Sequence, residues 1–548
     1  MLRKELLFAA FCVLFIAGLP NLARAAYHHM GESDAPKVQK VYPGAAGTKL
    51  DTCTLCHSGG TDSIRGKNTT FGSCQWCHYR YGYDGKGDKN ATLNTYGREY
   101  RAAGRSMAAL KSIEGRDSDG DGYSNIDEIR SIRYPGDAKD DPSKAVAPFR
   151  IFTREQLRSM PRHSQFLLMN ASKDGDYYAE YSGVIMEYLL ARAGIAPSAR
   201  KITVYSPDGY SQGHPIEADN SGDPYVNGAY PAAPYYYALE ADKAKTSYGW
   251  CDYSSPGNAG RKNGDPISTR NGLRLLLALR IEGRDLAPGT LGPGNRLAKN
   301  SEGPYRVIAP QKIVSPPDQP SNSPNRGKIW PYDFNLDHNA GTSTKCATII
   351  KVEPLPAGTT DIDIMEAGWG YIDQGKVIIY GNLQGPRPVS PENHAVDVSR
   401  NPTVFSWEKS PGVKAEDIVR YRLDYTSQDP SRGHWKSVVI SKETASGARG
   451  GLPGAGVAFF GVCGLVALAR GKSARRLASF LLVGALATAA LASYGSATGA
   501  SGGGLKAAIA HSESIALNPD TTYWWRVTDV DGNGGSTTSE IFNFRTGK

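Results

Sequence analysis

The sequence predicts a multidomain α+β protein with a small α-helical module, a mixed α/β domain, and a β-sandwich interrupted by a helical transmembrane hairpin. Three observations lead to this class. The 548 residues are enough for roughly three or four domains of ordinary size. Glycine and proline are abundant, with 62 and 34 copies, and this composition favours strands, turns and long ordered loops over a helical bundle. Two apolar runs joined by a basic connection interrupt a series of strand-like segments near the C-terminal end.

The first 25 residues are typical of a secretory signal. Arg3 and Lys4 precede an apolar run from Leu6 to Leu19, and Ala23-Arg24-Ala25 forms a small-x-small cleavage site. The mature chain is therefore expected to begin at Ala26. An uncleaved anchor helix is the alternative, because the apolar run is only slightly shorter than a membrane span. Both interpretations place the following residues outside the cytoplasm.

Residues 26–145 contain two copies of one cysteine pattern, Cys53-Thr-Leu-Cys56-His57 and Cys74-Gln-Trp-Cys77-His78. This is the attachment signature of c-type haem. Two thiols three positions apart can each form a thioether to one edge of the porphyrin, while the adjacent imidazole reaches the iron. A zinc site or a redox dithiol does not need a histidine directly after the second cysteine. We therefore expect two haem c groups, attached through Cys53, Cys56, Cys74 and Cys77, with His57 and His78 as iron ligands.

Each haem iron takes a sixth ligand, and this module offers few candidates. The other histidines are His28 and His29, and the thioethers are Met30 and Met107. Adjacent side chains on an extended segment point in opposite directions, so the two histidines could serve two closely spaced haems. We predict bis-histidine ligation of at least one haem, which gives a lower potential than His/Met ligation. The alternative is a pair of exposed N-terminal histidines without a ligand role.

An acidic segment downstream of the haem signatures matches the calcium loop of an EF-hand. Glycine at its sixth position permits the sharp turn, and the flanking segments 107–113 and 126–132 are expected to be helical. A solvated Asp/Gly turn is the alternative. A single EF-hand is expected to stabilise the structure rather than to act as a calcium sensor. The predicted ligands of one calcium ion are Asp117, Asp119, Asp121, the backbone carbonyl of Tyr123, Asn125 and both carboxylate oxygens of Glu128.

These motifs resemble small exported cytochromes of metal-respiring and related bacteria. In that family a CxxCH is followed by a Leu-Asn-x-Tyr-Gly segment and a DSDGDGxSN calcium loop. Here the middle segment is Leu93-Asn94-Thr95-Tyr96-Gly97. The resemblance covers residues 26–145 and implies electron transfer, but the family's electron partners are diverse and do not carry over.

Residues 146–375 are expected to form a mixed α/β domain. The segment 149–157 reads as a strand and the start of a helix, 181–190 as an amphipathic helix, and 201–205 as a strand. Together with 302–308, this succession resembles the molybdopterin-binding domain of sulfite oxidase-type oxidoreductases. In that family a cysteine thiolate ligates molybdenum, but the matching stretch here, 166–175, contains no cysteine. The resemblance therefore implies a fold and makes molybdenum catalysis doubtful.

Cys251 and Cys346 are the only thiols of this region, and both lie far downstream of the expected ligand position. A disulfide between them, in an oxidising compartment, and burial as two free thiols are alternatives that the sequence leaves open. His163, His214 and His338 lack ligand spacing and are expected to be ordinary surface or core histidines.

Residues 388–450 and 505–548 are expected to be the two halves of one β-sandwich. Apolar and polar residues alternate with the period of strands in 402–407, 419–425, 435–440, 515–517, 522–527 and 541–544. These segments resemble a fibronectin type III sandwich, with Leu517 to Tyr523 as the corner between strands E and F. Sandwiches of this type usually present surfaces to partners and seldom catalyse reactions.

The interruption, residues 455–494, is expected to be a transmembrane helical hairpin. Its apolar runs, Ala455 to Ala469 and Leu477 to Tyr494, are each slightly below the ~20 residues needed to cross a membrane as a helix. Glycine and alanine permit close helix packing, and the basic connection 470–476 would stay on the cytoplasmic side. A buried soluble hairpin is the alternative.

Together these features predict a membrane-tethered di-haem cytochrome that carries electrons on the periplasmic face of the inner membrane, with the outer surface as an alternative location. Its expected partners are other cytochromes or a quinol-linked complex, and enzymatic activity is not expected. The net charge of +9 is modest, and no compact basic run lies between Ala26 and Arg449, so nucleic acid is excluded as a partner. The alternatives are a molybdenum oxidoreductase with a fused cytochrome and a surface scaffold or adhesion protein that contains haem.

Overall fold

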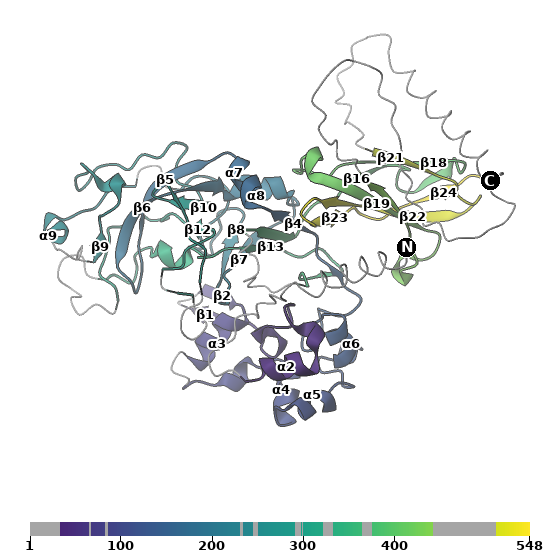
Figure 1. Ribbon diagram of the computed structural model, residues 1–548, viewed down its shortest axis with the longest axis horizontal. Coiled ribbons are helices and arrows are strands. Elements are labelled where there is room, and N and C mark those ends of the chain that lie inside the picture. Colours follow the sequence, from purple (N-terminus) through teal and green to yellow (C-terminus); the bar gives the residue numbers. More distant parts are fainter. Residues whose placement is uncertain are drawn as a thin grey trace, which may run out of the picture. The chain divides into compact units, whose positions relative to one another are not determined.

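The computed structural model of the chain is drawn in Figure 1. The chain divides into two compact units, Met1–Lys442 with Ala510–Lys548, and Glu443–Ile509. The second unit lies wholly outside the described residues, as do the predicted signal peptide and both N-terminal histidines. The described ranges are 33–64, 67–82, 86–230, 234–244, 250–290, 297–298, 300–321, 332–363, 375–441 and 511–548.

The N-terminal module, residues 33–141, combines short helices with one β-hairpin. Its core is aromatic and aliphatic, and Tyr96, Leu110 and Ile113 are fully buried there. The hairpin lies between the two CxxCH segments along the chain. The elements are α2 (Ala35–Val41), η1 (Pro43–Ala45), η2 (Cys53–Leu55), β1 (Gly60–Ile64), β2 (Lys67–Phe71), α3 (Ser73–Tyr81), η3 (Lys89–Thr92), α4 (Thr95–Ala102), α5 (Met107–Ser112) and α6 (Asn125–Arg130).

The central region is built from two larger sheets and the small sheet of β3 and β14. The first has the order β11-β10-β6-β5, with β12 on β10 and β9 on β6, and the second contains the order β4-β15-β13-β7-β8. One apolar cluster draws residues from both sheets and from α8, which buries Met186, Leu189 and Leu190. The strands are β3 (Ala145–Val146), β4 (Phe149–Phe152), β5 (His163–Met169), β6 (Asp176–Ile185), β7 (Lys201–Tyr205), β8 (Ser211–Pro215), β9 (Cys251–Asp252), β10 (Leu276–Ile281), β11 (Arg284–Asp285), β12 (Arg306–Ile308), β13 (Ile349–Glu353), β14 (Thr359–Thr360) and β15 (Val377–Gly381).

Helices are few in this region: α7 (Arg154–Ser159), α8 (Met186–Ala193) and α9 (Glu240–Lys243), with short turns at η4 (Pro256–Asn258) and η6 (Asn339–Thr342). A capping box between Thr153 and Gln156 starts α7. The amphipathic helix predicted over 181–190 is half wrong, because residues 181–185 belong to β6. The reason is tertiary: Gly183 pairs with both His163 and Ala278, and a Cβ there would lie 2.0 Å from the Leu277 carbonyl oxygen.

The C-terminal strands form two sheets that pack as a β-sandwich. One sheet has the order β16-β18-β21, and the other contains β17-β24-β22-β19-β20. Trp407, Leu423 and Trp525 are fully buried between them. At the predicted corner the Tyr523 hydroxyl accepts a hydrogen bond from the Asn518 backbone N–H at 3.1 Å. The elements are β16 (Arg387–Ser390), β17 (Ala395–Val398), β18 (Thr403–Glu408), η7 (Ala415–Asp417), β19 (Ile418–Thr426), η8 (Pro430–Arg432), β20 (Lys436–Ser441), β21 (His511–Ile515), β22 (Thr522–Asp531), β23 (Ser536–Thr538) and β24 (Phe542–Thr546).

The predicted fold class is wrong. Strands make up most of the regular structure that is described, and the N-terminal module contains the β1–β2 hairpin beside helices of only six to nine residues. Gly82 and Gly104 follow α3 and α4 with positive φ, a conformation that ends helices. Within the described ranges no helix has the length and apolar character to span a membrane. The hairpin predicted at 455–494 lies outside those ranges.

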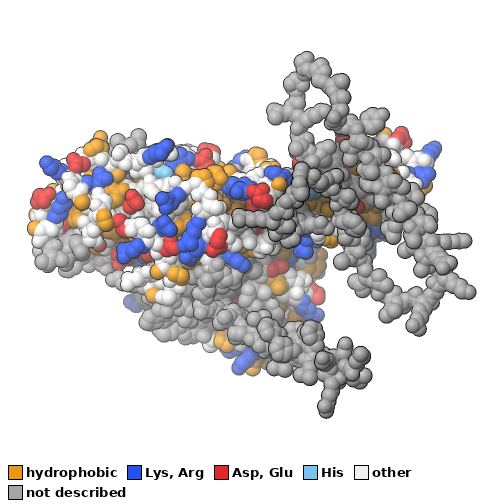
Figure 2. Space-filling model, turned by 45° about the horizontal axis from the view of Figure 1, so that its top comes forward, with side chains coloured by type: hydrophobic (Ala, Val, Ile, Leu, Met, Phe, Trp, Pro, Cys, Tyr) orange, Lys and Arg blue, Asp and Glu red, His pale blue; other side chains and the backbone are white. Residues whose placement is uncertain are grey.

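Charges of both signs are interspersed on the surface. Figure 2 shows Lys and Arg side chains next to Asp and Glu side chains on the face it displays. Exposed ion pairs among the described residues include Arg158 with Asp285 and Arg387 with Glu408. Exposed pairs of this kind contribute little to stability.

Candidate haem and calcium sites

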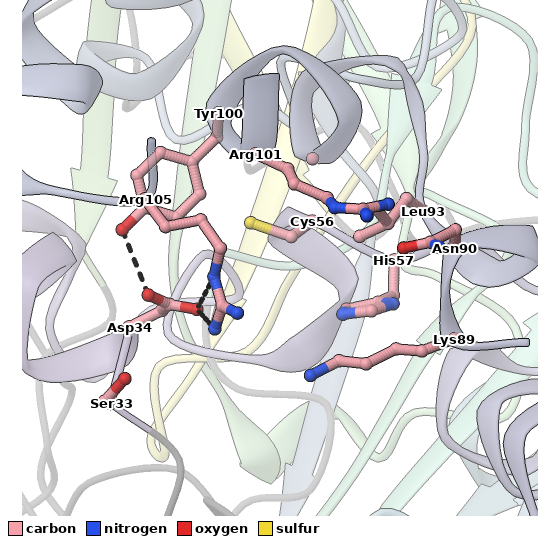
Figure 3. A pocket seen from close by; sticks show the side chains of 11 residues that line it. Ser33, Asp34, Cys56, His57, Lys89, Asn90, Leu93, Tyr100, Arg101 and Arg105 are labelled. Atoms are coloured by element: carbon pink, nitrogen blue, oxygen red, sulfur yellow. Dashed lines mark hydrogen bonds and ion pairs between the residues drawn. The ribbon is translucent and has the colours of Figure 1, made fainter. Parts of the chain in front are cut away.

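The first CxxCH segment forms a single tight turn. Residues Cys53–Leu55 are a 3₁₀ helix, and the Cys53 carbonyl accepts hydrogen bonds from the backbone N–H groups of Cys56 at 3.1 Å and His57 at 2.9 Å. Cys56 and His57 therefore follow each other around one turn and line the same cavity, as Figure 3 shows. These backbone hydrogen bonds place the Cys56 thiol and the His57 imidazole side by side.

The segment 93–97 clamps this turn. The Asn94 side chain donates to the carbonyls of Thr54 at 3.2 Å and Leu55 at 3.1 Å, and its oxygen accepts the Gly97 N–H at 2.8 Å, which caps α4. The Asn94 backbone N–H also donates to the Cys56 carbonyl at 3.0 Å. A Cβ at Gly97 would lie 2.1 Å from that same carbonyl oxygen. Glycine is needed because the helix packs directly on the first CxxCH turn.

Two cavities adjoin the first motif. One, of about 330 Å³, has charged walls formed by Asp34, Lys89, Arg101 and Arg105 (Figure 3). The other, of about 90 Å³, is lined partly by apolar side chains, including Val38, Leu50 and Leu55. Cys56 and His57 border both cavities. A haem has an apolar macrocycle and two anionic propionates, so the chemistry of these walls fits the predicted group.

His57 is held in the state that can bind iron. Burial, together with the positive charges of Lys89 and Arg105, lowers its pKa to about 4. The imidazole is therefore neutral at pH 7, and a neutral imidazole nitrogen is the form that ligates metals. Its Nδ1 lies 2.8 Å from the Thr92 hydroxyl.

The second CxxCH segment lies within a regular helix. Cys74 and Cys77 are three positions apart in α3, which places both thiols on one helix face, with His78 directly after them. The two motifs touch, because the hydroxyls of Thr54 and Ser73 are 2.8 Å apart. Burial and the neighbouring Cys53 raise the pKa of the Cys77 thiol. Thiols from the two motifs are thus neighbours.

Hydrogen bonds to Ser211 and aromatic contacts also hold the second motif in place. The Gln75 amide donates to the Ser211 carbonyl at 2.8 Å and to its hydroxyl at 2.9 Å. Trp76 stacks on Tyr79 with ring centroids 5.8 Å apart, and Tyr79 stacks on Phe71 at 5.2 Å. Tyr79 itself is 46% exposed, so this aromatic group borders solvent.

The candidates for the sixth iron ligand are only partly described. His28, His29 and Met30 lie outside the described residues. Met107 is the first residue of α5 and is 48% exposed. Bis-histidine ligation therefore stays a prediction.

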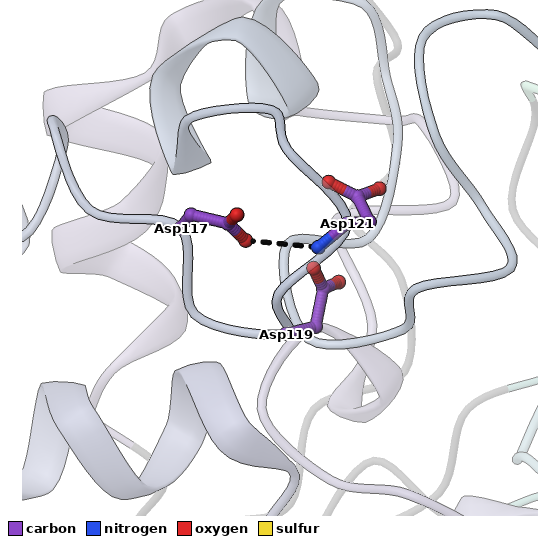
Figure 4. Close-up of side chains that lie close together, drawn as sticks. All are labelled: Asp117, Asp119 and Asp121. Atoms are coloured by element: carbon purple, nitrogen blue, oxygen red, sulfur yellow. Dashed lines mark hydrogen bonds between the residues drawn. The ribbon is translucent and has the colours of Figure 1, made fainter.

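The acidic loop has the geometry of a cation site. One carboxylate oxygen from each of Asp117, Asp119 and Asp121 lies within 4.8 Å of the others, and Figure 4 shows the three side chains converging. Asp117 is fixed by accepting the N–H groups of Gly120 at 2.7 Å and Gly122 at 2.9 Å. The loop runs between α5 and α6 in the order that an EF-hand requires.

The buried carboxylates of this loop need a positive charge to compensate their negative charges. Both oxygens of Glu128 and of Asp119 are buried without a hydrogen-bond partner among the described residues. Burial and repulsion from neighbouring aspartates raise the pKa of Glu128 to about 9 and that of Asp119 to about 6. Buried carboxylates of this kind are normally paired or bound to a metal. The residues therefore fit calcium.

Asn125 and Tyr123 have separate places in this loop. The Asn125 side chain donates to the Ile113 carbonyl at 2.7 Å and accepts the Ser118 N–H at 3.2 Å, so it braces the loop. The Tyr123 backbone N–H donates to Asp121 at 2.9 Å, and its ring is exposed. Ser118 also donates to Glu99 of α4 at 2.9 Å, which ties the loop to the helix that clamps the first motif.

The thiols of the central region are separate. Cys251 and Cys346 are both buried, belong to different apolar clusters, and form no disulfide. Burial raises the pKa of both thiols, so neither is a reactive thiolate. The stretch 166–175 begins in β5, where Phe166 stacks on Tyr178 at 5.7 Å.

Sequence reasoning missed several residues of the first site. Thr92 contacts the imidazole, while Lys89 and Arg101 line the charged cavity. In the sequence, Lys89 and Thr92 lie shortly before the Leu-Asn-x-Tyr-Gly segment, and Arg101 lies shortly after it. The sequence did not reveal the structural role of that segment, so this position was the only signal. His163, His214 and His338 lie far from this site in the chain, and His214 is buried with Nδ1 3.0 Å from the Pro224 carbonyl.

Comparisons with known proteins add little to this geometry. No protein-family model matches the chain, and no curated protein matches it. Among solved structures, the FN1–FN3 domains of chicken CNTN1 align with 10% sequence identity over 70% of this chain and 98% of that chain, with a TM-score of 0.15. A likeness at this TM-score carries no argument, so the description of the β-sandwich rests on its own strand order and tyrosine corner.

Proposed function

We propose that this chain is an exported di-haem c-type cytochrome that transfers electrons outside the cytoplasm and that binds one calcium ion structurally. The observation that carries the proposal is the first CxxCH turn, where Cys56 and a neutral His57 line two cavities, one with charged walls and the other partly apolar. When bound, haem supplies a one-electron iron couple.

The residues of the chain supply attachment, orientation and proximity. Cys53, Cys56, Cys74 and Cys77 would hold the two haems, and His57 and His78 would ligate the irons. The contact between Thr54 and Ser73, at 2.8 Å, supports close spacing of the two groups and therefore electron exchange between them. The proposed partners are other redox proteins, such as cytochromes or a quinol-linked complex.

Calcium has a mechanical part in this proposal. The loop is hydrogen-bonded to α4 through Ser118 and Glu99, and α4 packs its Gly97 against the Cys56 carbonyl. A cation that draws the carboxylates of Asp119 and Glu128 together would stiffen this connection. The proposed role of calcium is therefore to stabilise the first haem site.

The test is haem content by the pyridine haemochrome assay and protein mass, on chain made in a host that matures c-type cytochromes. The parent should contain two haems, and Cys53→Ala/Cys56→Ala and Cys74→Ala/Cys77→Ala should each contain one. Cys251→Ala/Cys346→Ala is the matched control, because those thiols are buried elsewhere, and it should keep both haems.

Metal analysis of the same preparations separates the alternatives. Iron and calcium at two and one per chain, without molybdenum, agree with the proposal. A colourless parent of unmodified mass contradicts it, and stoichiometric molybdenum would favour an oxidoreductase instead.

A further inference from the structure

Thr92 is a buried hydroxyl placed against the imidazole of the first motif. It is the last residue of η3, and its side chain is fully excluded from solvent. Its Oγ1 donates to the Lys89 carbonyl at 2.7 Å and lies 2.8 Å from His57 Nδ1. Both distances are those of well-formed hydrogen bonds.

The two contacts together decide which nitrogen of His57 carries the proton. A threonine hydroxyl has one hydrogen, and the Lys89 carbonyl can only accept it. Toward His57 the Thr92 oxygen can therefore only accept, so Nδ1 must be the protonated nitrogen. In the neutral imidazole the lone pair is then on Nε2.

The backbone keeps the Thr92 hydroxyl in this place. Asp88 caps η3 by accepting the Asn90 N–H at 2.8 Å. The Thr92 carbonyl accepts the N–H of Ser58 at 3.0 Å, and Leu93 forms a β-bridge with His57. The chain on both sides of His57 is thus tied to the chain at Thr92, and the hydroxyl has little freedom to turn away.

We propose that Thr92 is a positioning residue that holds His57 with its Nε2 lone pair toward the iron of the first haem. The inference rests on the proposed function, since it names how that haem's own ligand is oriented. A hydrogen bond from the far nitrogen of a metal-bound histidine fixes the ring and raises its basicity. A more basic ligand stabilises the oxidised iron, so Thr92 lowers the reduction potential of this haem.

The experiment is potentiometric titration of the purified di-haem protein and three variants. Thr92→Val removes the acceptor at nearly constant volume and should raise one of the two reduction potentials more than the other, since Thr92 also hydrogen-bonds to Cys77 of the second motif. Thr92→Ser keeps the hydroxyl and should keep both potentials. Thr95→Val is the matched control, because the Thr95 hydroxyl is buried nearby without a hydrogen-bond partner among the described residues, and it should leave both potentials unchanged.

Equal potentials in Thr92→Val and the parent, with two haems in each, would overturn the proposal, as would equal shifts in Thr92→Val and Thr92→Ser. If Thr92→Val does not fold, the proposal is tested on the parent protein by NMR of ¹⁵N-labelled histidine in the diamagnetic state. One axial histidine should then show a slowly exchanging Nδ1 proton, and rapid exchange at both would refute the role of Thr92. A parent without haem would instead reject the proposed function, which the haemochrome assay detects first.

Discussion

The two CxxCH segments have the same attachment residues but different local structures. The first is a 3₁₀ turn whose carbonyls and imidazole are held by Thr92 and Asn94. The second is part of α3, a nine-residue helix that fixes the thiols by its own periodicity. The same pentapeptide pattern therefore occurs on two different backbone conformations. The first site depends on distant residues, and the second depends mainly on its own helix.

The largest effect is expected from Gly97→Ala. The added Cβ would overlap the Cys56 carbonyl oxygen at 2.1 Å, so either α4 or the first motif must move. We expect a loss of about 3 kcal/mol in the free energy of unfolding and displacement of the first haem site, measured by thermal unfolding and by the spectrum of each haem. The control is Gly115→Ala, where a Cβ meets no atom within 4 Å. Equal stability of both variants would show that α4 does not clamp the motif.

Calcium removal is expected to have the next largest effect. A ligand present at 100 times its dissociation constant stabilises the folded state by about 2.7 kcal/mol, so a chelator should lower the melting temperature accordingly. Because the loop is bonded to α4 through Ser118 and Glu99, the first haem should respond more than the second. Readdition of calcium should restore the parent curve, and a chelator-insensitive melting temperature would contradict a bound ion.

The calcium-free chain should also show a distinct pH dependence. Burial beside four aspartates raises the pKa of Glu128 from 4.5 to about 9, so without calcium the folded state binds this proton more tightly than the unfolded state. The contribution of Glu128 to the free energy of unfolding is fully present below about pH 4.5 and is lost as pH rises through about 9. Chemical denaturation across this range should reveal the decline without calcium, and Glu128→Gln should remove the Glu128 contribution.

A smaller effect is expected from Asn94→Ala. The substitution removes the N-cap of α4 and two hydrogen bonds to the carbonyls of Thr54 and Leu55, and should cost about 2 kcal/mol. The potential of the first haem should shift, while the second should not. A uniform change at both haems would mean that the motifs share one support.

The smallest effect is expected from Gln75→Ala in the second motif. Its amide makes two hydrogen bonds to Ser211, whose net contribution is about 1 kcal/mol. Haem attachment through Cys74 and Cys77 should be complete, because the helix α3 supplies their spacing. A loss of the second haem in this variant would show that the second site needs external support as much as the first.

Sequence patterns predicted the local features well wherever short-range chemistry decides them. The segment expected as a strand at 201–205 is β7, and the expected corner at Tyr523 has its hydrogen bond to Asn518. The helices flanking the acidic loop lie within two residues of their expected bounds. The fold class was wrong because periodicity could not show that residues 181–185 pair in a sheet or that the helices end within nine residues.

By itself the sequence predicted the chemistry of the proposed sites, because thioether attachment, imidazole ligation and a cage of oxygen ligands each need particular residue types at fixed spacing. Only the tertiary structure decided their environment. It brought Thr92 to the imidazole, packed Gly97 on the Cys56 carbonyl and buried Glu128 without a hydrogen-bond partner in the described part of the chain. Spacing along the chain reports which atoms can react, whereas burial, proton position and support arise from residues that meet only when the chain folds.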